Sequence, residues 1–240
     1  MKIIEKLNKK QDIFGGKSVT IAFLGDSVTQ GCFENYIMTD GGINTRFEYK
    51  NSYAARVGQI LNILYPFVQV NIINSGISGD SAPNGARRFD RDIASYSPDL
   101  IVVSYGLNDC TYGKDNVDKY VSALEEIFEK AKETGAEIVF LTQNYMATRT
   151  SIKMREPALI KLSEEFAGLQ NDGTLKFYFE NAKELCKKLG VPVCDLYSLW
   201  ERMALAGTDT TELLANKLNH PIREMHYYTA IKLVETFYEK

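Results

Sequence analysis

The chain has 240 residues, of which 45% are hydrophobic, so it can bury a full core without disulfides or metal ions. Its formal net charge of −3 leaves no basic face for phosphate backbones or anionic lipid, which argues against nucleic-acid and membrane-surface partners. We therefore expect one domain that acts on a small molecule or a neutral polymer.

The cysteines and the N-terminus exclude further classes. Cys32, Cys110, Cys186 and Cys194 form no CxxC pair and have no histidine at ligand spacing, so we predict free thiols and no metal site. The first ten residues carry charges where a signal peptide needs a continuous apolar segment, and no apolar run approaches the ~20 residues of a spanning helix. These features predict a cytoplasmic protein without membrane insertion, although a leader removed beforehand would leave the same sequence.

In chain order, short apolar runs with β-branched residues alternate with segments of helical period. We predict strands at residues 19–24, 68–73, 100–104, 137–141 and 191–194, and helices at 51–64, 117–131 and 223–238. Polar stretches at 32–50, 144–156 and 168–175 are predicted to be loops. The alternation indicates an α/β fold with a doubly wound parallel five-stranded sheet, covered by helices on both faces.

Polar residues follow each of the first three predicted strands. They lie at Gly25-Asp26-Ser27, at residues 74–81, and at Tyr105-Gly106-Leu107-Asn108-Asp109. In a doubly wound sheet the ligand binds beyond the carboxyl ends of the strands, because loop amides and helix N-termini converge there. All three segments are therefore expected to face one crevice.

Ser27 ends the apolar run at residues 21–24, where a nucleophile of such a sheet would lie. A serine hydroxyl needs a base to remove its proton and donors to hold the oxyanion that forms. The chain has two histidines, and His220, in a polar stretch near the C-terminus, is the candidate base. The candidate oxyanion donors are the backbone amides of Ser27 and Gly79 and the side-chain amide of Asn108. Loss of one such donor typically costs ~10² to 10³ in rate.

These residues lie in four blocks whose order resembles that of the SGNH hydrolase superfamily, the GDSL-type esterases and lipases. Gly25-Asp26-Ser27 resembles the nucleophile block, Gly79 the glycine block, Gly106-Leu107-Asn108-Asp109 the GxND block, and His220-Pro221 the histidine of the last block. Each block alone occurs by chance in unrelated proteins. Their joint order at strand ends is specific, and the resemblance covers about residues 19–238.

The resemblance implies a flavodoxin-like three-layer α/β/α fold in a single domain, residues 1–240, with its core at about 19–238. It also implies hydrolysis of esters through an acyl-serine intermediate, without a cofactor. The implied roles are nucleophile for Ser27, base for His220, and oxyanion donors for Gly79, Asn108 and the Ser27 amide.

The sequence departs from the family pattern at one position. The family usually has an aspartate three residues before the histidine, which orients the imidazole, and Lys217 stands there. A backbone carbonyl could accept the Nδ1 proton of His220 instead, which would leave a Ser-His dyad. A carboxylate from Asp209, Glu212 or Glu224 could also take this place, and loss of activity is the third alternative.

Other polar residues near these blocks have structural interpretations. Asp26, Asp80 and Asp109 are expected to bind loop amides and shape the turns rather than act as acids. His226, at the start of the last helix, is expected to be structural, and Cys110 to be a small buried apolar residue.

Two loops are candidates for the walls of a substrate cleft. One runs from Cys32 to Asn51 with several aromatic residues, and the other covers residues 143–149 after the fourth strand. For both, an ordinary surface or oligomer contact stays open as the alternative.

We therefore expect a serine esterase that releases a short acyl group, with acetyl as the leading case, from a carbohydrate or another small polar alcohol. A lysophospholipase or acyl-thioesterase using the same site is the alternative, and Lys217 also leaves room for a non-catalytic glycan-binding protein. With His220 as base, activity should fall on acidification around pH ~6.5, unless a carboxylate raises this value. The oligomeric state stays open.

Overall fold

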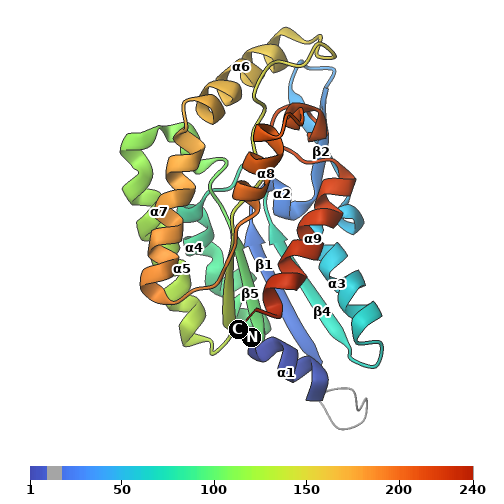
Figure 1. The fold of residues 1–240 in the computed structure, drawn as a ribbon, viewed down its shortest axis with the longest axis vertical. Helices are drawn as coiled ribbons and strands as arrows, with labels where there is room; N and C mark the ends of the chain where they lie inside the picture. The colour runs from blue at the N-terminus through green and yellow to red at the C-terminus, as the bar shows by residue number, and fades with distance from the viewer. Residues whose placement is uncertain (10–17, 240) are drawn as a thin grey trace.

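The computed structural model describes residues 1–9 and 18–239. The predicted domain at 1–240 also includes residues 10–17 and 240, which lie outside the described residues. A central sheet lies between helices, and the two ends of the chain lie close together at one end of the molecule (Figure 1).

Five parallel strands form the sheet in the order β4-β1-β5-β6-β7. Their bounds are Val19–Gly25 for β1, Val70–Gly76 for β4, Leu100–Ser104 for β5, Glu137–Leu141 for β6 and Val193–Cys194 for β7. The first strand of the sheet along the chain is β1; the chain then forms the β4 edge and returns to β5 on the other side of β1, which is the flavodoxin-like order. The predicted fold class is confirmed, and β4 and β7 begin two residues later than predicted.

The pairing of β1 brings three strand ends to the same level. Gly25 lies opposite Gly76 of β4 and Ser104 of β5. Residues 21–25 are buried, because β1 has a neighbouring strand on each edge and a helical layer on each face. The polar segments that follow β1, β4 and β5 therefore leave the sheet side by side, as the sequence predicts.

Two helical layers cover the sheet. Helices α3 (Tyr53–Leu64) and α9 (Arg223–Phe237) pack together on one face, while α4 (Ala82–Asp92), α5 (Val117–Glu133) and α7 (Thr174–Leu189) form the layer on the other (Figure 1). The remaining helices are α1 (Lys2–Lys9), α2 (Ser27–Gln30), α6 (Pro157–Asn171) and α8 (Leu196–Leu205).

The three predicted helices are present within two residues of their expected ends. In α5 the apolar residues at helical spacing are buried, and Gly135 follows with a φ of 76°, which only glycine adopts readily. Helix α3 begins at Tyr53, because the hydroxyl of Ser52 accepts the N–H of Ala55 and caps the helix.

The prediction of a loop is wrong for two segments. The segment 32–50 contains an antiparallel hairpin, β2 (Cys32–Ile37) and β3 (Ile43–Phe47), which is a separate two-stranded sheet. β2 is buried only at its first two residues, Cys32 and Phe33, β3 has no buried residue, and the register is irregular near Cys32, so the strands lack the alternating pattern of a strand with one buried face.

The predicted loop at 168–175 is helical except for Asp172 and Gly173. Helix α6 runs through Gly168 to Asn171, and α7 starts at Thr174. Gly173, with a φ of 77°, turns the chain between them. A cluster of turn-forming residues therefore marks a real break, but a much shorter one than predicted.

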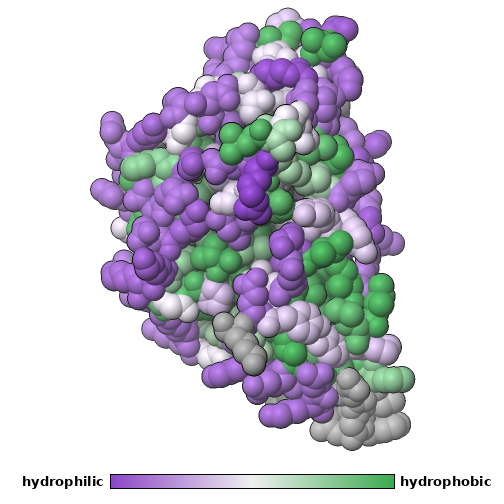
Figure 2. All heavy atoms as spheres, in the orientation of Figure 1, coloured by the Kyte–Doolittle hydropathy of each residue, from purple (hydrophilic) through white to green (hydrophobic). Residues whose placement is uncertain are grey.

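Hydrophobic side chains gather on the side of the molecule where α3 and α9 lie (Figure 2). Exposed large hydrophobic residues of α3, α9 and the turn after α3 include Ile63, Leu64, Phe67 and Ile231. Among residues 1–9 and 18–239, no helix has both the length and the apolar character needed to cross a membrane.

Candidate active site

Ser27 lies where β1 turns into the short helix α2. Asp26 caps this helix, since its Oδ1 accepts the N–H of Val28 at 3.0 Å. The turn is tight: a Cβ on Gly25 would lie 2.7 Å from the carbonyl oxygen of Ser104. The N–H groups of a first helical turn have no acceptor in the helix, so the Ser27 amide is one of the groups available to an incoming oxygen.

His220 faces Ser27 across the strand ends. Its Nε2 lies 3.0 Å from Ser27 Oγ, which is hydrogen-bond distance. Burial lowers the pKa of His220 to about 4, although the hydrogen bond to a backbone carbonyl raises it in part. The imidazole is therefore neutral at pH 7 and can accept a proton.

The other ring nitrogen of His220 faces the main chain. Nδ1 lies 3.0 Å from the carbonyl oxygen of Phe33, in β2. A carbonyl oxygen only accepts, so Nδ1 carries the proton and Nε2 directs its lone pair to the Ser27 hydroxyl. This geometry matches the first alternative left open by the sequence, a backbone carbonyl in place of the missing aspartate.

The three carboxylates considered as substitutes lie elsewhere. Asp209 pairs with Arg149, and Glu212 pairs with Lys217 at 3.2 Å. Lys217 also donates to the Glu212 carbonyl at 2.8 Å, so its side chain is engaged within its own loop. Glu224 is exposed at the start of α9.

The loop that carries His220 is held by two buried amides. Asn216 Oδ1 accepts three consecutive backbone N–H groups, those of Leu218, Asn219 and His220, at 2.9 to 3.0 Å. Asn144 Nδ2 donates to the carbonyl of Asn219 at 2.8 Å. Within the candidate cleft wall at residues 143–149, residues 143–147 are buried, and Asn144 supports the His220 loop.

The two remaining candidate oxyanion donors lie next to each other. Asn108 Nδ2 donates one hydrogen to the carbonyl of Asp80 at 2.7 Å, which leaves its second hydrogen for another acceptor. Asp80 follows Gly79, whose φ is 77°. A Cβ built on Gly79 meets no atom within 4 Å, so the glycine leaves open space there.

Gln143 joins the nucleophile segment to the Asn108 segment. Its Nε2 donates to Asp26 Oδ2 at 2.8 Å and its Oε1 accepts the N–H of Leu107 at 2.9 Å. Asp26 is fully buried, and burial raises its pKa to about 7. Asp26 thus binds amides and shapes the turn, as predicted, and the sequence gives no signal for Gln143 because its partners are distant in the chain.

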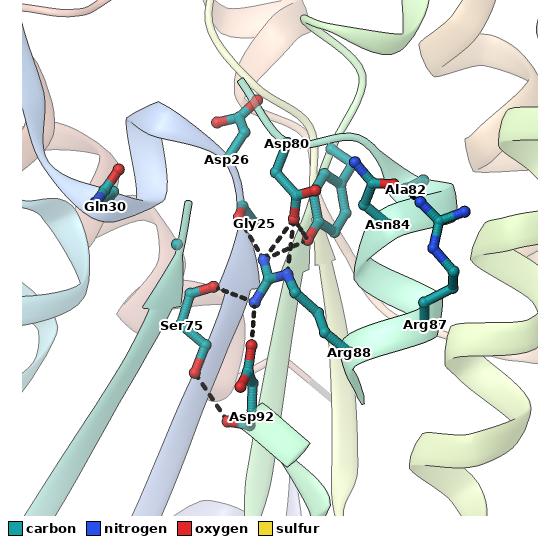
Figure 3. A network of polar contacts seen from close by, with 12 residues as sticks. Gly25, Asp26, Gln30, Ser75, Asp80, Ala82, Asn84, Arg87, Arg88 and Asp92 are labelled. Atoms are coloured by element: carbon teal, nitrogen blue, oxygen red, sulfur yellow. Dashed lines mark hydrogen bonds and ion pairs between the residues drawn. The ribbon is translucent and has the colours of Figure 1, made fainter. Parts of the chain in front are cut away.

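Arg88 of α4 points toward the carboxyl ends of β1 and β4 (Figure 3). Its guanidinium donates to the carbonyls of Gly25 and Ser75 at 3.0 and 2.7 Å. It also binds Asp80 Oδ2 at 2.8 Å and the Tyr105 hydroxyl at 2.8 Å. The prediction that the Asp80 side chain binds loop amides is wrong, because this carboxylate lies against a buried arginine and a phenol.

The other residues given structural interpretations are buried, and His226 and Asp109 each bind a backbone N–H group. His226 Nδ1 accepts the N–H of Tyr53 at 3.1 Å, and burial lowers the pKa of His226 to about 3. Asp109 Oδ1 accepts the N–H of Ala82 at 2.9 Å, and burial raises the pKa of Asp109 to about 7. Burial also raises the pKa of the Cys110 thiol, which makes it a weak nucleophile.

All four cysteines lie in the described part of the chain as buried free thiols. Within that part, no three or more histidine, cysteine, aspartate or glutamate side chains come together in a group that could hold a metal ion.

A protein-family model described as the GDSL-like lipase/acylhydrolase family matches residues 23–227, which include Ser27, Gly79, Asn108 and His220. The chain belongs to this family. The resemblance identified in the sequence is thereby confirmed, on a match that spans most of the chain.

Two related proteins match part of the chain at low sequence identity. The chain is 24% identical to an acetylxylan esterase of Geobacillus stearothermophilus over 149 residues, 58% of this chain and 66% of the relative. It is 29% identical to the uncharacterized lipoprotein YqeF of Bacillus subtilis (strain 168) over 140 residues, 52% of this chain and 56% of the relative. The chain thus spans less than two thirds of the length of either relative.

Solved structures share the fold. A two-domain esterase (CEX) active on acetylated mannans superposes with a TM-score of 0.68 at 17% identity, covering 100% of this chain and 54% of that protein. Axe2, an acetylxylan esterase from Geobacillus stearothermophilus, gives a TM-score of 0.67 at 19% identity, covering 94% of this chain and 96% of that protein.

Proposed function

We propose that this protein is a serine esterase that removes a short acyl group, acetyl above all, from a carbohydrate or another small polar alcohol. One observation carries the proposal: His220 Nε2 lies 3.0 Å from Ser27 Oγ, in a chain of the GDSL-like lipase/acylhydrolase family. A nucleophile and a base within hydrogen-bond distance are the minimum machinery of acyl transfer to serine.

In the proposed first step, His220 Nε2 takes the proton of Ser27 Oγ as this oxygen attacks the ester carbonyl. The amides of Ser27 and Gly79 and the free N–H of Asn108 then hold the oxyanion. The carbonyl of Phe33 accepts a hydrogen bond from Nδ1–H and so stabilises the imidazolium. His220 next gives its proton to the leaving alcohol, and water, activated by the same imidazole, hydrolyses the acyl-serine.

The substrate class rests on two similar proteins. The acetylxylan esterase relative and the esterase active on acetylated mannans both act on acetylated polysaccharides.

The mechanism is tested with Ser27→Ala. This variant should lose turnover of an activated acetate ester and labelling by a fluorophosphonate probe, while the unchanged protein keeps both. Ser95→Ala is the matched control, because the Ser95 hydroxyl only donates to the Arg91 carbonyl on an exposed turn. Turnover that persists in Ser27→Ala would remove the mechanism.

The acyl length and the alcohol are tested separately. We expect faster hydrolysis of acetyl than of octanoyl esters, and release of acetate from acetylated xylo- or manno-oligosaccharides. Faster octanoyl hydrolysis would favour the lysophospholipase or acyl-thioesterase alternative. Binding of an acetylated oligosaccharide without hydrolysis and without probe labelling would indicate a glycan-binding protein.

A further inference from the structure

The acceptor that faces His220 belongs to a hairpin outside the main sheet. The Phe33 carbonyl is part of the peptide group that joins Phe33 to Glu34, in β2. Among the residues that the structure describes, β2 pairs with β3 alone, and neither strand belongs to the main sheet. Orientation of His220 therefore depends on contacts that fix this one peptide group against the start of α9.

Arg223, the first residue of α9, contacts both residues of that peptide group. Its guanidinium carbon lies 4.4 Å from the centre of the Phe33 ring. Nη1 and Nη2 donate to the two oxygens of Glu34 at 2.7 and 3.0 Å, which is a bidentate pair. Arg223 thus holds Phe33 by its ring and Glu34 by its carboxylate.

A second carboxylate ties Arg223 to the far end of the hairpin. Glu48, just after β3, accepts from Arg223 Nε at 2.8 Å, and its own N–H donates to the carbonyl of Gly31 at 2.9 Å. Gly31 ends α2, the helix that starts with Ser27. The contacts of Arg223 therefore connect the His220 segment, the hairpin and the Ser27 helix.

Further contacts keep these partners in place. The buried ring of Phe33 also packs against His226, one turn along α9, with ring centres 4.9 Å apart. Hydrogen bonds from Arg223 lower the pKa of Glu34 and bring that of Glu48 to about 2. Both carboxylates therefore stay charged over the range in which an esterase works.

We propose that Arg223 is the positioning residue that replaces the missing aspartate: it holds the Phe33 carbonyl at Nδ1 of His220, and so orients the base. Arg223 can act on the orientation of His220 directly, because the two residues are three positions apart in one segment. One end of the segment carries the imidazole. The other end binds the side chains of the two residues whose peptide group the imidazole contacts. This role rests on the proposed esterase function only for its effect on rate.

The first test compares Arg223→Ala with Arg223→Lys. We expect Arg223→Ala to lower kcat by about 10- to 100-fold with KM within about twofold, because a small displacement of a catalytic group costs rate rather than binding. Arg223→Lys should restore only part of kcat, since an ammonium cannot bind two carboxylates in a bidentate manner or stack as a plane.

Lys176→Ala is the matched control. Lys176 forms a surface pair with Glu201 at 2.8 Å on α7 and α8, away from the hairpin, so its removal should leave kcat unchanged. A kcat for Arg223→Ala within twofold of the unchanged protein, with the fold intact, would overturn the proposal. A loss carried by KM alone would do the same.

A second readout does not depend on turnover. Proton NMR of the protein with ¹⁵N-labelled histidine should show a protected Nδ1–H signal of His220, shifted downfield by its bond to the carbonyl. In Arg223→Ala this signal should broaden or vanish, while the ring signals of His226 remain. An unchanged His220 signal would overturn the proposal. An unmodified protein that shows the signal but hydrolyses no ester would refute the esterase function and leave the role of Arg223 in orienting His220 supported.

Discussion

The environment of His220 sets the pH range in which it can act as a base. Burial lowers the pKa of His220 to about 4, and a backbone carbonyl, a weaker partner for an imidazolium than a carboxylate, faces its Nδ1. We expect kcat/KM to stay level from pH 8 to about pH 5 and to fall with a midpoint near pH 4, because protonated His220 cannot accept the Ser27 proton.

Hydrolysis of an activated acetate ester between pH 3 and 8 measures this midpoint, with circular dichroism at each pH to show that the protein stays folded. The sequence alone predicts about 6.5, the value for an exposed imidazole. A measured midpoint at or above pH 6 would mean that a charged partner stabilises the imidazolium during turnover.

Asn108 offers a test of the oxyanion site. Replacement of Asn108 by alanine should lower kcat by ~10² to 10³ with little change in KM, because the donor acts mainly on the charge that develops in the transition state. Asn181→Ala is the control, since Asn181 Nδ2 donates at 2.8 Å to a backbone carbonyl on the exposed side of α7. Equal kcat values for the two variants would exclude Asn108 as an oxyanion donor.

The residues proposed to act directly on the ester are the part of the site that motifs predict. Ser27, Gly79, Asn108 and His220 occur in recognisable blocks, because each must have one chemical group at one strand end. The Phe33 carbonyl has no such signal, since every residue has a backbone carbonyl. The partner of His220 Nδ1 had no signal either, because the backbone carbonyl and the carboxylates of Asp209, Glu212 and Glu224 could be ranked only once the path of the His220 loop was known.

At the scale of elements, α4 connects the strand ends through one buried side chain. Arg88 is 8% exposed and pairs with Asp80 and Asp92 at 2.7 and 2.9 Å. Arg88→Met keeps an unbranched apolar stem but removes the guanidinium, which leaves both carboxylates without this partner. Breaking a buried ion pair costs about 3 to 5 kcal/mol, so we expect the melting temperature to fall by roughly 6 to 20 °C.

Thermal unfolding followed by circular dichroism measures this loss. Arg87→Met on the same helix is the control, because Arg87 is exposed and the change should shift the melting temperature by no more than ~2 °C. Similar shifts in the two variants would show that the Arg88 contacts contribute little to stability.

The elements themselves were predictable where burial imposes a period. The strands of the main sheet are continuous apolar runs, and α5 repeats its apolar residues every three to four positions, so both were found. The hairpin at residues 32–47 escaped because neither of its strands has a fully buried face. The connection at Asp172-Gly173 was overestimated because Gly168, inside α6, resembles a loop residue in the sequence.

At the scale of the whole molecule, buried ionisable groups make stability depend on pH in opposite directions. Asp26 and Asp109 have folded pKa values of about 7 against 3.8 for the free side chain, so their contribution is lost as pH rises through this interval. His220 and His226 have folded values of about 4 and 3 against 6.5, so their contribution is lost as pH falls. The two effects oppose each other between about pH 4 and 6.5.

The variant Asp109→Asn distinguishes the contribution of Asp109 to stability from that of the buried histidines. The amide keeps an oxygen for the N–H of Ala82 but cannot ionise, so the variant avoids the cost of a buried charge above pH 7. A change of one pKa unit corresponds to ~1.4 kcal/mol, and burial raises the pKa of Asp109 from 3.8 to about 7. We expect the melting temperature to rise by about 4 °C or more at pH 8 and to change little at pH 4.

Melting curves at both pH values measure this difference. Asp115→Asn, at an exposed position a few residues along, should show no such difference. A lower melting temperature of Asp109→Asn at pH 8 would show that the folded protein stabilises the ionised carboxylate of Asp109.

The hydrogen bond between His220 and the Phe33 carbonyl has a consequence for how this protein tolerates mutation. A triad built on an aspartate can be disabled by one codon change, whereas no substitution removes a main-chain oxygen. An alanine scan would therefore remove the hydroxyl and the imidazole directly, but would affect this main-chain acceptor only through residues that hold it, such as Arg223. Only a change to the backbone itself, such as an ester in place of the amide between Phe33 and Glu34, would weaken that acceptor directly.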